Sequence, residues 1–271
     1  MKYKLVVIDV DGTLVDKHGN IAEEDKHAIT RLLNSYVIVA LSTGRVIQAC
    51  LPIIDELNLN TFHIFFDGAL IYNPKNIREI YVKEVESELV REAVEFSRKN
   101  NIYLELYSSE KFFAERENWS DEVHRKFFRV EPTFVNFDGI WARERILKAE
   151  VVVHNDEEAV KAKLFKDNFD SRFHFSVARS PAYPDIDFIN ILNRDASKGQ
   201  ALKELMSFWG HLPAEVIAIG DGLNDIPLLE EAGVSVAMGN AFPEVKQIAD
   251  YITLDIEQHG VAAAINFFFP V

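Results

Sequence analysis

Residues 4–13 read KLVVIDVDGT, an uninterrupted apolar run that ends in two aspartates, a glycine and a threonine. Residues 5–8 are branched and apolar with no polar alternation, a pattern typical of a strand that is buried on both faces of a parallel sheet. Parallel sheets of α/β proteins hold their ligands at the carboxyl ends of such strands. We therefore expect Asp9 and Asp11 to lie at a ligand site.

These two aspartates are one residue apart, so an extended backbone through Val10 points both carboxylates the same way. One carboxylate could attack phosphorus to give an aspartyl-phosphate, while the other protonates the leaving oxygen and later deprotonates water. Gly12 allows a tight turn, and Thr13 can hydrogen-bond within it. A calcium loop of the EF-hand type also begins Asp-x-Asp, but Leu14 and Asn20 replace its glycine and its bidentate glutamate. An aspartate-rich turn without chemistry is the plainer alternative.

Composition describes a globular and acidic chain. Its 271 residues, 48% of them hydrophobic, suit one large or two modest domains with real cores. A formal charge of -14 disfavours attraction to nucleic acid or to an anionic membrane. Cys50, the only cysteine, excludes an internal disulfide and a cysteine-based zinc cluster and fits a reducing compartment. The chain enters its first strand directly and no apolar run approaches membrane-spanning length, so we expect a cytoplasmic protein.

The first third of the chain alternates between buried strands and helices. Apolar runs predict strands over residues 5–8, 36–41, 62–66 and 70–72. We expect one helix, capped by Asn20, after the first strand and another beginning near Val46. The resulting order β-α-β-α-β is typical of a doubly wound α/β domain.

The second predicted strand leads into STGR, residues 42–45. A small hydroxyl residue and a glycine between a strand and a helix leave backbone N–H groups free to hold a phosphate oxygen. Thr43 is therefore a candidate to bind a phosphoryl group, although a plain helix cap is the more frequent role of such a threonine. Arg45 could contact a phosphate or a sugar hydroxyl, or could form a surface ion pair.

The pattern changes near residue 83, where strands become shorter and alternate in polarity, as in antiparallel sheets with one solvated face. We interpret residues 83–187 as an inserted α/β domain that interrupts a first domain made of residues 1–82 and 188–271. Within the insertion we expect helices over 84–99, 120–128 and 156–169 and strands over 102–108, 112–115, 149–154, 172–178 and 185–192. A helix over 198–209 and strands over 216–219, 234–237 and 251–253 then resume the first pattern.

The strand predicted over 216–219 ends in GDGLND, residues 220–225. Gly220 and Gly222 suggest a dinucleotide-binding fingerprint, but Asp225 stands where that fingerprint needs its third glycine. Carboxylate and amide groups at a strand end suit Mg²⁺, which takes few protein oxygens, keeps several waters and accepts phosphate oxygens. The sequence Gly-Lys-Ser/Thr does not occur, so the chain has no P-loop.

Chemistry-bearing residues thus follow three strands and begin one helix, and this combination resembles the haloacid dehalogenase superfamily of phosphohydrolases. Its four motifs are matched by DVDGT at 9–13, Thr43, Lys198 and GDGLND at 220–225. The place of the insertion and the sequence STGR resemble the Cof-type subgroup with a type IIB (C2B) α/β cap. The resemblance implies a Rossmann-like, doubly wound parallel-sheet core with an inserted α/β cap domain. One departure is Asp67, because the subgroup usually has asparagine there.

The resemblance also implies a role for each motif residue. Asp9 is expected to be the nucleophile and Asp11 the general acid/base, with Lys198 neutralising the phosphoryl group. Mg²⁺ is expected on Asp9, the backbone carbonyl of Asp11 and Asp221, with Asp225 just outside the direct ligands. Contacts with the phosphoryl group or the rest of the substrate are expected from Gly12, Thr13, Thr43, Gly44, Arg45, Lys198 and Asn224.

We therefore predict a Mg²⁺-dependent phosphatase that hydrolyses small phosphorylated metabolites through an aspartyl-phosphate. Sugar phosphates are the expected class by family analogy alone. A phosphomutase of the same superfamily, which returns the phosphoryl group to a sugar, is one alternative. A noncatalytic sensor of phosphometabolites is another, although pure binding needs no nucleophile beside an acid/base. We expect a monomer or a small homo-oligomer without nucleic-acid or membrane partners.

Overall fold

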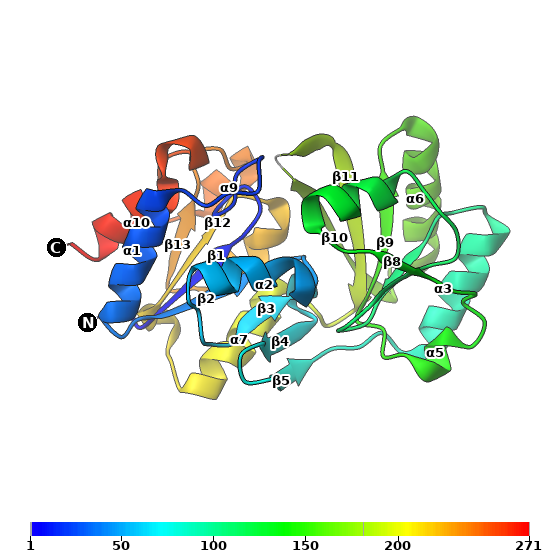
Figure 1. Ribbon diagram of the computed structural model, residues 1–271, viewed down its shortest axis with the longest axis horizontal. Coiled ribbons are helices and arrows are strands. Elements are labelled where there is room, and N and C mark those ends of the chain that lie inside the picture. The colour runs from blue at the N-terminus through cyan, green and yellow to red at the C-terminus, as the bar shows by residue number, and fades with distance from the viewer. Residues whose placement is uncertain (1, 181, 271) are drawn as a thin grey trace.

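The computed structural model describes residues 2–180 and 182–270. The chain forms two lobes, each built on its own β-sheet (Figure 1). Both ends of the chain lie in one lobe, which we call the core, and a continuous internal stretch forms the other, which we call the cap. This arrangement confirms the predicted α/β class with a parallel central sheet.

The core contains an eight-stranded sheet in the order β14-β13-β12-β1-β2-β3-β4-β5. Its central strand β1 pairs in parallel with β2 on one side and β12 on the other, and every residue of β1 is buried. Burial on both faces explains why residues 5–8 show no polar alternation. The strands are β1 (Leu5–Asp9), β2 (Ile38–Ser42), β3 (His63–Phe65), β4 (Leu70–Asn73), β5 (Arg78–Val82), β12 (Val216–Gly220), β13 (Val234–Ala237) and β14 (Tyr251–Ile252).

Helices cover both faces of this sheet. The predicted starts of the first helix and of the second strand are wrong. The first helix begins at Glu23, after Ala22, because Asn20 belongs to a turn in which its N–H donates to Asp16. The second strand begins at Ile38 because Tyr36 has a positive φ and closes a turn. The core helices are α1 (Glu23–Asn34), α2 (Ile47–Glu56), α7 (Lys198–Trp209), α8 (Ile226–Glu231), α9 (Pro243–Ile248) and α10 (Gly260–Phe268).

The cap contains a six-stranded sheet in the order β10-β11-β9-β6-β7-β8. Helices α3 and α6 lie on the side of this sheet that faces away from the core (Figure 1). The strands are β6 (Glu105–Tyr107), β7 (Phe112–Ala114), β8 (Pro132–Phe134), β9 (Lys148–Val153), β10 (Phe173–Ser180) and β11 (Tyr183–Asn193). The helices are α3 (Ser87–Lys99), α4 (Ser120–Val123), which continues as a π-helical turn η2 (His124–Phe128), α5 (Ile140–Arg143) and α6 (Asp156–Phe169).

Strand β9 shows how the cap sheet divides its two faces. Ala149, Val151 and Val153 pack into the hydrophobic cluster under α3 and α6. Side chains alternate along a strand, so Lys148 and Glu150 project from the opposite face. That face covers the core and is buried, which differs from the solvated face expected for these alternating strands.

Strand β11 crosses residue 187, where the sequence places the end of the inserted domain. It stays paired with β9 through Leu192 and with β10 through Asn193. Its residue Ile191 packs into the hydrophobic cluster under the cap helices. The strand therefore belongs to the cap sheet over its whole length. We therefore propose that the cap extends to about Asn193 and that the second half of the core begins just after it.

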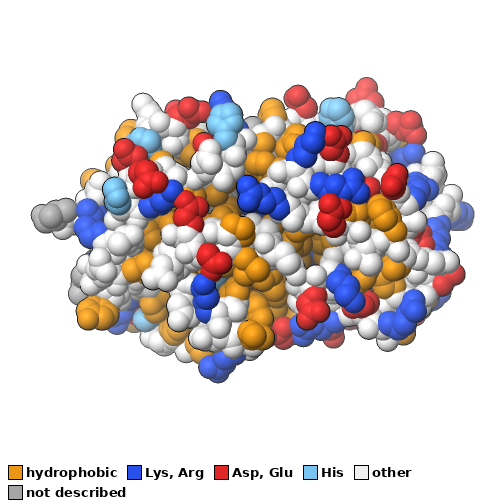
Figure 2. Space-filling view, in the orientation of Figure 1, with side chains coloured by type: hydrophobic (Ala, Val, Ile, Leu, Met, Phe, Trp, Pro, Cys, Tyr) orange, Lys and Arg blue, Asp and Glu red, His pale blue; other side chains and the backbone are white. Residues whose placement is uncertain are grey.

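The face of the molecule drawn in Figure 2 has no continuous basic area that would attract a large anionic partner. On the face drawn in Figure 2, acidic and basic side chains are interspersed, and neither sign forms a continuous area. Among the described helices, none combines the length and the apolar character that crossing a membrane requires.

Helices α1 and α10 are joined by a buried carboxylate. Asp25 on α1 is 1% exposed, and it accepts a hydrogen bond of 2.7 Å from the backbone N–H of Ala262 on α10. Burial raises the pKa of Asp25 to about 6, although the bond from Ala262 opposes the rise. The folded protein thus holds this proton more tightly than the unfolded chain, so this group lowers stability as pH rises from its unfolded pKa to about 6.

We expect Asp25→Asn to remove this contribution, because asparagine can accept the bond from Ala262 but never ionises. Between about pH 4 and about pH 7, the free energy of unfolding of the variant should rise relative to wild type by up to about 3 kcal/mol. Urea unfolding of both proteins across this range measures the difference. Identical pH dependence in the two proteins would contradict the assignment.

A second stability prediction concerns Gly68, which lies against the start of α7. Gly68 has a φ of +99°, and an added Cβ would stand 2.1 Å from the carbonyl oxygen of Ser197. Gly19 has a φ of +83°, but no atom lies within 4 Å of the position that its Cβ would take. Gly19→Ala therefore tests the backbone conformation alone.

Gly68→Ala should lower the free energy of unfolding by about 3 kcal/mol or more, because it adds a steric clash with the backbone to the conformational cost. Gly19→Ala should lower it by only about 1 kcal/mol. Chemical denaturation of the two variants checks this difference. Equal losses would mean that the contact with α7 is not tight.

Candidate active site

Three strands of the core sheet end at one edge and bring distant residues together. Asp9 ends β1, Thr43 follows β2, and Asp221 follows β12. The carboxyl ends of parallel strands meet at one edge of a sheet, which is where α/β proteins bind ligands. A cavity of about 650 Å³ lies over this edge and is lined on the other side by residues of the cap.

The predicted site residues divide into those that line this cavity and those that support it from behind. The lining includes Asp9, Asp11, Thr43, Gly44, Arg45, Asp221 and Asn224. The supporting residues, which contact these or pack against them, are Gly12, Thr13, Lys198 and Asp225.

Lys198 links the two halves of the core at the base of the cavity. It is the first residue of α7 and is 1% exposed. Its Nζ lies 2.6 Å from Oδ1 of Asp9 and 2.6 Å from Oδ1 of Asp225. Burial alone would lower the pKa of Lys198, but the two carboxylates outweigh it and raise that pKa above its ordinary value. The lysine is therefore a fixed positive charge beside Asp9.

The carboxylates around Lys198 carry more negative charge than the lysine balances. Burial and the charge of Asp225 raise the pKa of Asp9 well above its usual value, against the opposing effect of Lys198. Burial and Asp225 likewise raise the pKa of Asp221 to about 8. One oxygen from each of these three aspartates lies within 4.8 Å of the others, so the cluster could hold a metal ion. A divalent cation would restore the ionised forms, and an all-oxygen donor set suits a hard one.

Asp225 is occupied by protein groups. Its Oδ1 accepts from Lys198, and its Oδ2 accepts from the backbone N–H groups of Asp221 and Gly222 at 3.1 and 2.9 Å. In contrast, Oδ2 of Asp9 has no hydrogen-bond partner among the described residues. These contacts support Asp225 as a residue that orients the site, with Asp9 and Asp221 as the carboxylates left for a cation.

Thr13 and Gly12 hold Asp221 in place. The Thr13 hydroxyl, which is fully buried, donates a hydrogen bond of 2.8 Å to Oδ1 of Asp221. Gly12 has a φ of +87°, and an added Cβ would stand 2.4 Å from Oδ2 of the same aspartate. The turn after β1 therefore packs directly on the carboxylate that follows β12. Neither residue is among those that line the cavity, and both support Asp221 from behind it.

Thr43 lines the cavity and orients the loop after β2. Its Oγ1 accepts a hydrogen bond of 3.0 Å from the backbone N–H of Arg45. This bond leaves the hydroxyl proton of Thr43 available, since no acceptor for it is found among the described residues. The threonine can therefore stabilise its loop and still donate to a phosphoryl oxygen.

Arg45 is 8% exposed, so its ion pair is not the surface pair that was one of the sequence-based alternatives. Its Nε and one terminal nitrogen donate to both oxygens of Asp11 at 2.8 and 2.6 Å. Burial alone would lower the pKa of Arg45, but the charge of Asp11 outweighs burial and raises that pKa above its ordinary value. The rings of Phe127 and Phe128 from the cap lie 5.2 and 5.3 Å from the guanidinium carbon. A cap element thus covers the arginine that holds Asp11.

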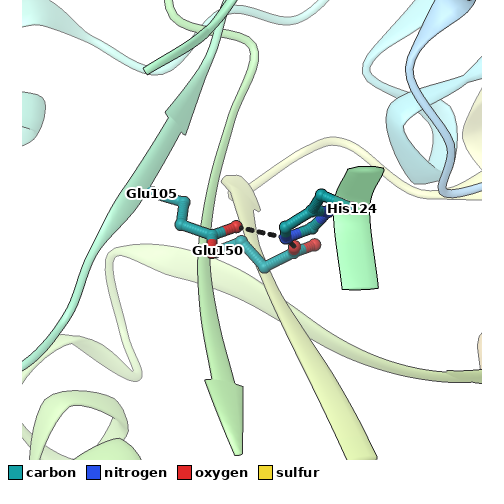
Figure 3. A group of neighbouring side chains, drawn as sticks. All are labelled: Glu105, His124 and Glu150. Atoms are coloured by element: carbon teal, nitrogen blue, oxygen red, sulfur yellow. Dashed lines mark ion pairs between the residues drawn. The ribbon is translucent and has the colours of Figure 1, made fainter. Parts of the chain in front are cut away.

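The cap contributes polar residues to the cavity that the sequence analysis did not identify. Tyr107, His124, Lys148, Glu150 and Asn190 all line it. Figure 3 shows the side chains of Glu105 and Glu150 converging on His124 from neighbouring elements. The alternation of Lys148 and Glu150 with apolar residues along β9 was the available signal, but it does not show which face a sheet will cover.

These cap groups form a buried network of balanced charge. Nε2 of His124 lies 3.0 Å from Glu105, and Nζ of Lys148 lies 2.5 Å from Glu150. Burial alone would lower the pKa of His124, but Glu105 raises it above its usual value, which favours the imidazolium. The hydroxyl of Tyr107 donates toward both carboxylates. Each carboxylate therefore has its own cation, and the network forms a polar roof over the cavity.

Comparison with known proteins agrees with this geometry. Residues 6–265 match the family of haloacid dehalogenase-like hydrolases. The chain is 32% identical to the protein YxeH of Bacillus subtilis (strain 168), over 97% of each chain. It is 30% identical to the 5-amino-6-(5-phospho-D-ribitylamino)uracil phosphatase YcsE of the same strain, over 97% of this chain and 94% of the other.

Solved structures share the whole fold. A haloacid dehalogenase-like hydrolase from Bacteroides thetaiotaomicron superposes with a TM-score of 0.84 at 27% identity, covering 99% of this chain and 100% of the other. The subclass IIB sugar phosphatase BT4131 superposes with a TM-score of 0.81 at 23% identity over 98% of each, which supports the fold alone. The convergence of the four motifs and these matches lead to one conclusion: the chain belongs to the haloacid dehalogenase-like hydrolases and is a phosphatase of their Cof-type branch.

Proposed function

We propose that the protein hydrolyses small phosphorylated metabolites, sugar or sugar-alcohol phosphates in particular, through an aspartyl-phosphate on Asp9 with Mg²⁺ as cofactor. The observation that carries the proposal is the position of Asp9. One of its oxygens is held by the buried ammonium of Lys198, and the other lines the cavity with no hydrogen-bond partner among the described residues. A carboxylate held in this way is oriented for attack, and a bound divalent cation would keep it ionised.

In the first half of the reaction, the free oxygen of Asp9 attacks phosphorus and the bond from phosphorus to the ester oxygen breaks. The leaving oxygen takes a proton from Asp11. In the second half, Asp11 removes a proton from water, which attacks the aspartyl-phosphate, releases inorganic phosphate and regenerates Asp9. Throughout, Thr43 donates to a phosphoryl oxygen, and Lys198 holds the attacking carboxylate.

A cation at this site would be held by Asp9 and Asp221, together with the backbone carbonyl of Asp11. When bound, Mg²⁺ supplies positive charge that stabilises the phosphoryl oxygens. The same charge stabilises the ionised form of the buried carboxylates. Arg45 donates hydrogen bonds to both oxygens of Asp11. Proton transfer therefore requires one of these oxygens to release the arginine and contact the substrate.

Hydroxyl-bearing leaving groups are supported by the roof of the cavity. Lys148 can donate and Glu150 can accept hydrogen bonds, while Phe128 and Phe188 add apolar walls. This mixture suits a polyol chain or a sugar attached to an apolar or ring portion. The relative YcsE is named for a substrate with a phosphorylated ribityl chain, which is a leaving group of this kind.

Asp9→Asn should abolish phosphate release, because an amide has no charged oxygen to attack phosphorus. Hydrolysis of p-nitrophenyl phosphate should fall by at least about 10³-fold. Asp167→Asn, on the exposed face of α6, is the matched control and should be fully active. Chelation should stop wild-type turnover and added Mg²⁺ should restore it. Undiminished activity in Asp9→Asn would exclude this residue as nucleophile.

Asp11→Asn should show a loss that depends on the leaving group. Turnover of an alkyl phosphate should fall by roughly 10² to 10⁴ because the leaving alkoxide needs a proton. The loss with p-nitrophenyl phosphate should be smaller, since p-nitrophenolate leaves without protonation. Steady-state kinetics with both substrates measures the ratio, and equal losses would count against Asp11 as the general acid.

A further inference from the structure

Asp67 joins the core to the cap beside the cavity without lining it. It follows β3, is 2% exposed, and its backbone N–H donates to the carbonyl of Thr43 at 3.0 Å. Its Oδ1 accepts from Nδ2 of Asn224 at 3.0 Å. Its Oδ2 accepts from Nδ2 of Asn190 on β11 at 2.8 Å and from the hydroxyl of Ser176 on β10. One core carboxylate therefore binds two strands of the cap.

The contact with Asn190 leads directly to the polar roof. Oδ1 of Asn190 accepts from Nζ of Lys148 at 2.9 Å, so its amide must turn its donor to Asp67 and its acceptor to the lysine. Lys148 also lies 2.5 Å from Glu150 and 3.4 Å from the carbonyl of Gly44. The core thus helps to set the position of this ammonium, through the amide of Asn190 and the carbonyl of Gly44.

We propose that Asp67 is a positioning residue that determines the selectivity of the phosphatase for hydroxyl-bearing leaving groups. By fixing Asn190, it presents Lys148 and Glu150 side by side at the cavity, where a hydroxyl of the leaving group can replace the carbonyl of Gly44, the most distant of the three acceptors of Lys148 at 3.4 Å. Such a pair matches two neighbouring hydroxyl groups, one of which accepts while the other donates. This inference rests on the proposed function for its readout, phosphate release, and for the place of the phosphoryl group beside Asp9.

A carboxylate at position 67 can accept from the donors on both of its sides at once. Asp67 accepts from donors on both of its oxygens, and an asparagine there would turn its own NH₂ group against one of them. The carboxylate is tolerated in a buried position because Nζ of Lys198 lies 3.9 Å away. Asp67 has two distinguishable effects, a charge near Lys198 and an acceptor for Asn190, and exchanging the two side chains separates them.

The experiment compares Asp67→Asn with the exchanged double variant, Asp67→Asn with Asn190→Asp. In the double variant the amide on the core donates to the carboxylate on the cap, which still accepts from Lys148. The connection is kept, while the charge leaves the neighbourhood of Lys198. Ribitol 5-phosphate and n-pentyl phosphate are the substrates, because they share a five-carbon chain and an alkoxide leaving group and differ in the hydroxyls.

We expect wild type to prefer ribitol 5-phosphate and Asp67→Asn to lose that preference. Its kcat/KM for ribitol 5-phosphate should fall roughly 10- to 100-fold, mainly through KM, with a change of less than about 3-fold for n-pentyl phosphate. The double variant should recover most of the preference. Asn190→Ser breaks the contact from the cap side and should match Asp67→Asn, which covers the case in which the core substitution impairs folding.

Hydrogen exchange gives a second readout that needs no turnover. Amides of β10 and β11 should exchange faster in Asp67→Asn than in wild type and return toward wild-type rates in the double variant. If wild type releases no phosphate from these substrates or from p-nitrophenyl phosphate, the proposed function fails. Exchange rates in Asp67→Asn that equal those of wild type would overturn the contact itself. Equal losses on both substrates, or a double variant as impaired as the single one, would overturn the selectivity role and assign the effect to charge near Lys198.

Discussion

The structure depends on one buried charge that must be paired. Lys198 stands 189 positions after Asp9 in the chain, yet its ammonium contacts that carboxylate and Asp225 in a site from which water is largely excluded. An unpaired ammonium or carboxylate there would cost several kcal/mol, so the two halves of the core are held to one arrangement despite the inserted cap. The same pairing leaves a surplus of negative charge at the strand ends, which suits the cation that we propose there.

Much of the core could be predicted because its signals are local. The apolar runs at β1 and β12 are long enough to identify buried parallel strands, and each ends in residues whose chemistry is specific. The topology then follows from the rule that such strands present their carboxyl ends on one edge. Elements at the periphery of the core were harder to predict, and β5 and α10 were missed. The start of α1 was misplaced because Asn20 forms a hydrogen bond within a turn instead of capping the helix.

The roof of the cavity and its link to the core could not be predicted from the sequence. Tyr107, Lys148 and Asn190 come from three strands of a mixed sheet, and only the pairing of β6, β9 and β11 places them together. A short strand with alternating polarity does not indicate whether its polar face meets water or another lobe. Similarly, the sequence showed Asp67 only as a departure from the family pattern, since its partners are more than 100 residues away.

The order of the strands has a consequence for how the protein is made. A ribosome adds about 5–20 residues per second, so roughly 10–40 seconds separate the synthesis of Asp9 from that of Lys198. During that interval β1 has emerged without its neighbour β12, and its terminal carboxylate lacks its counter-charge. The nascent chain must therefore keep an apolar strand edge protected until the last third is translated, while the cap sheet, whose strands are contiguous in the chain, can close first.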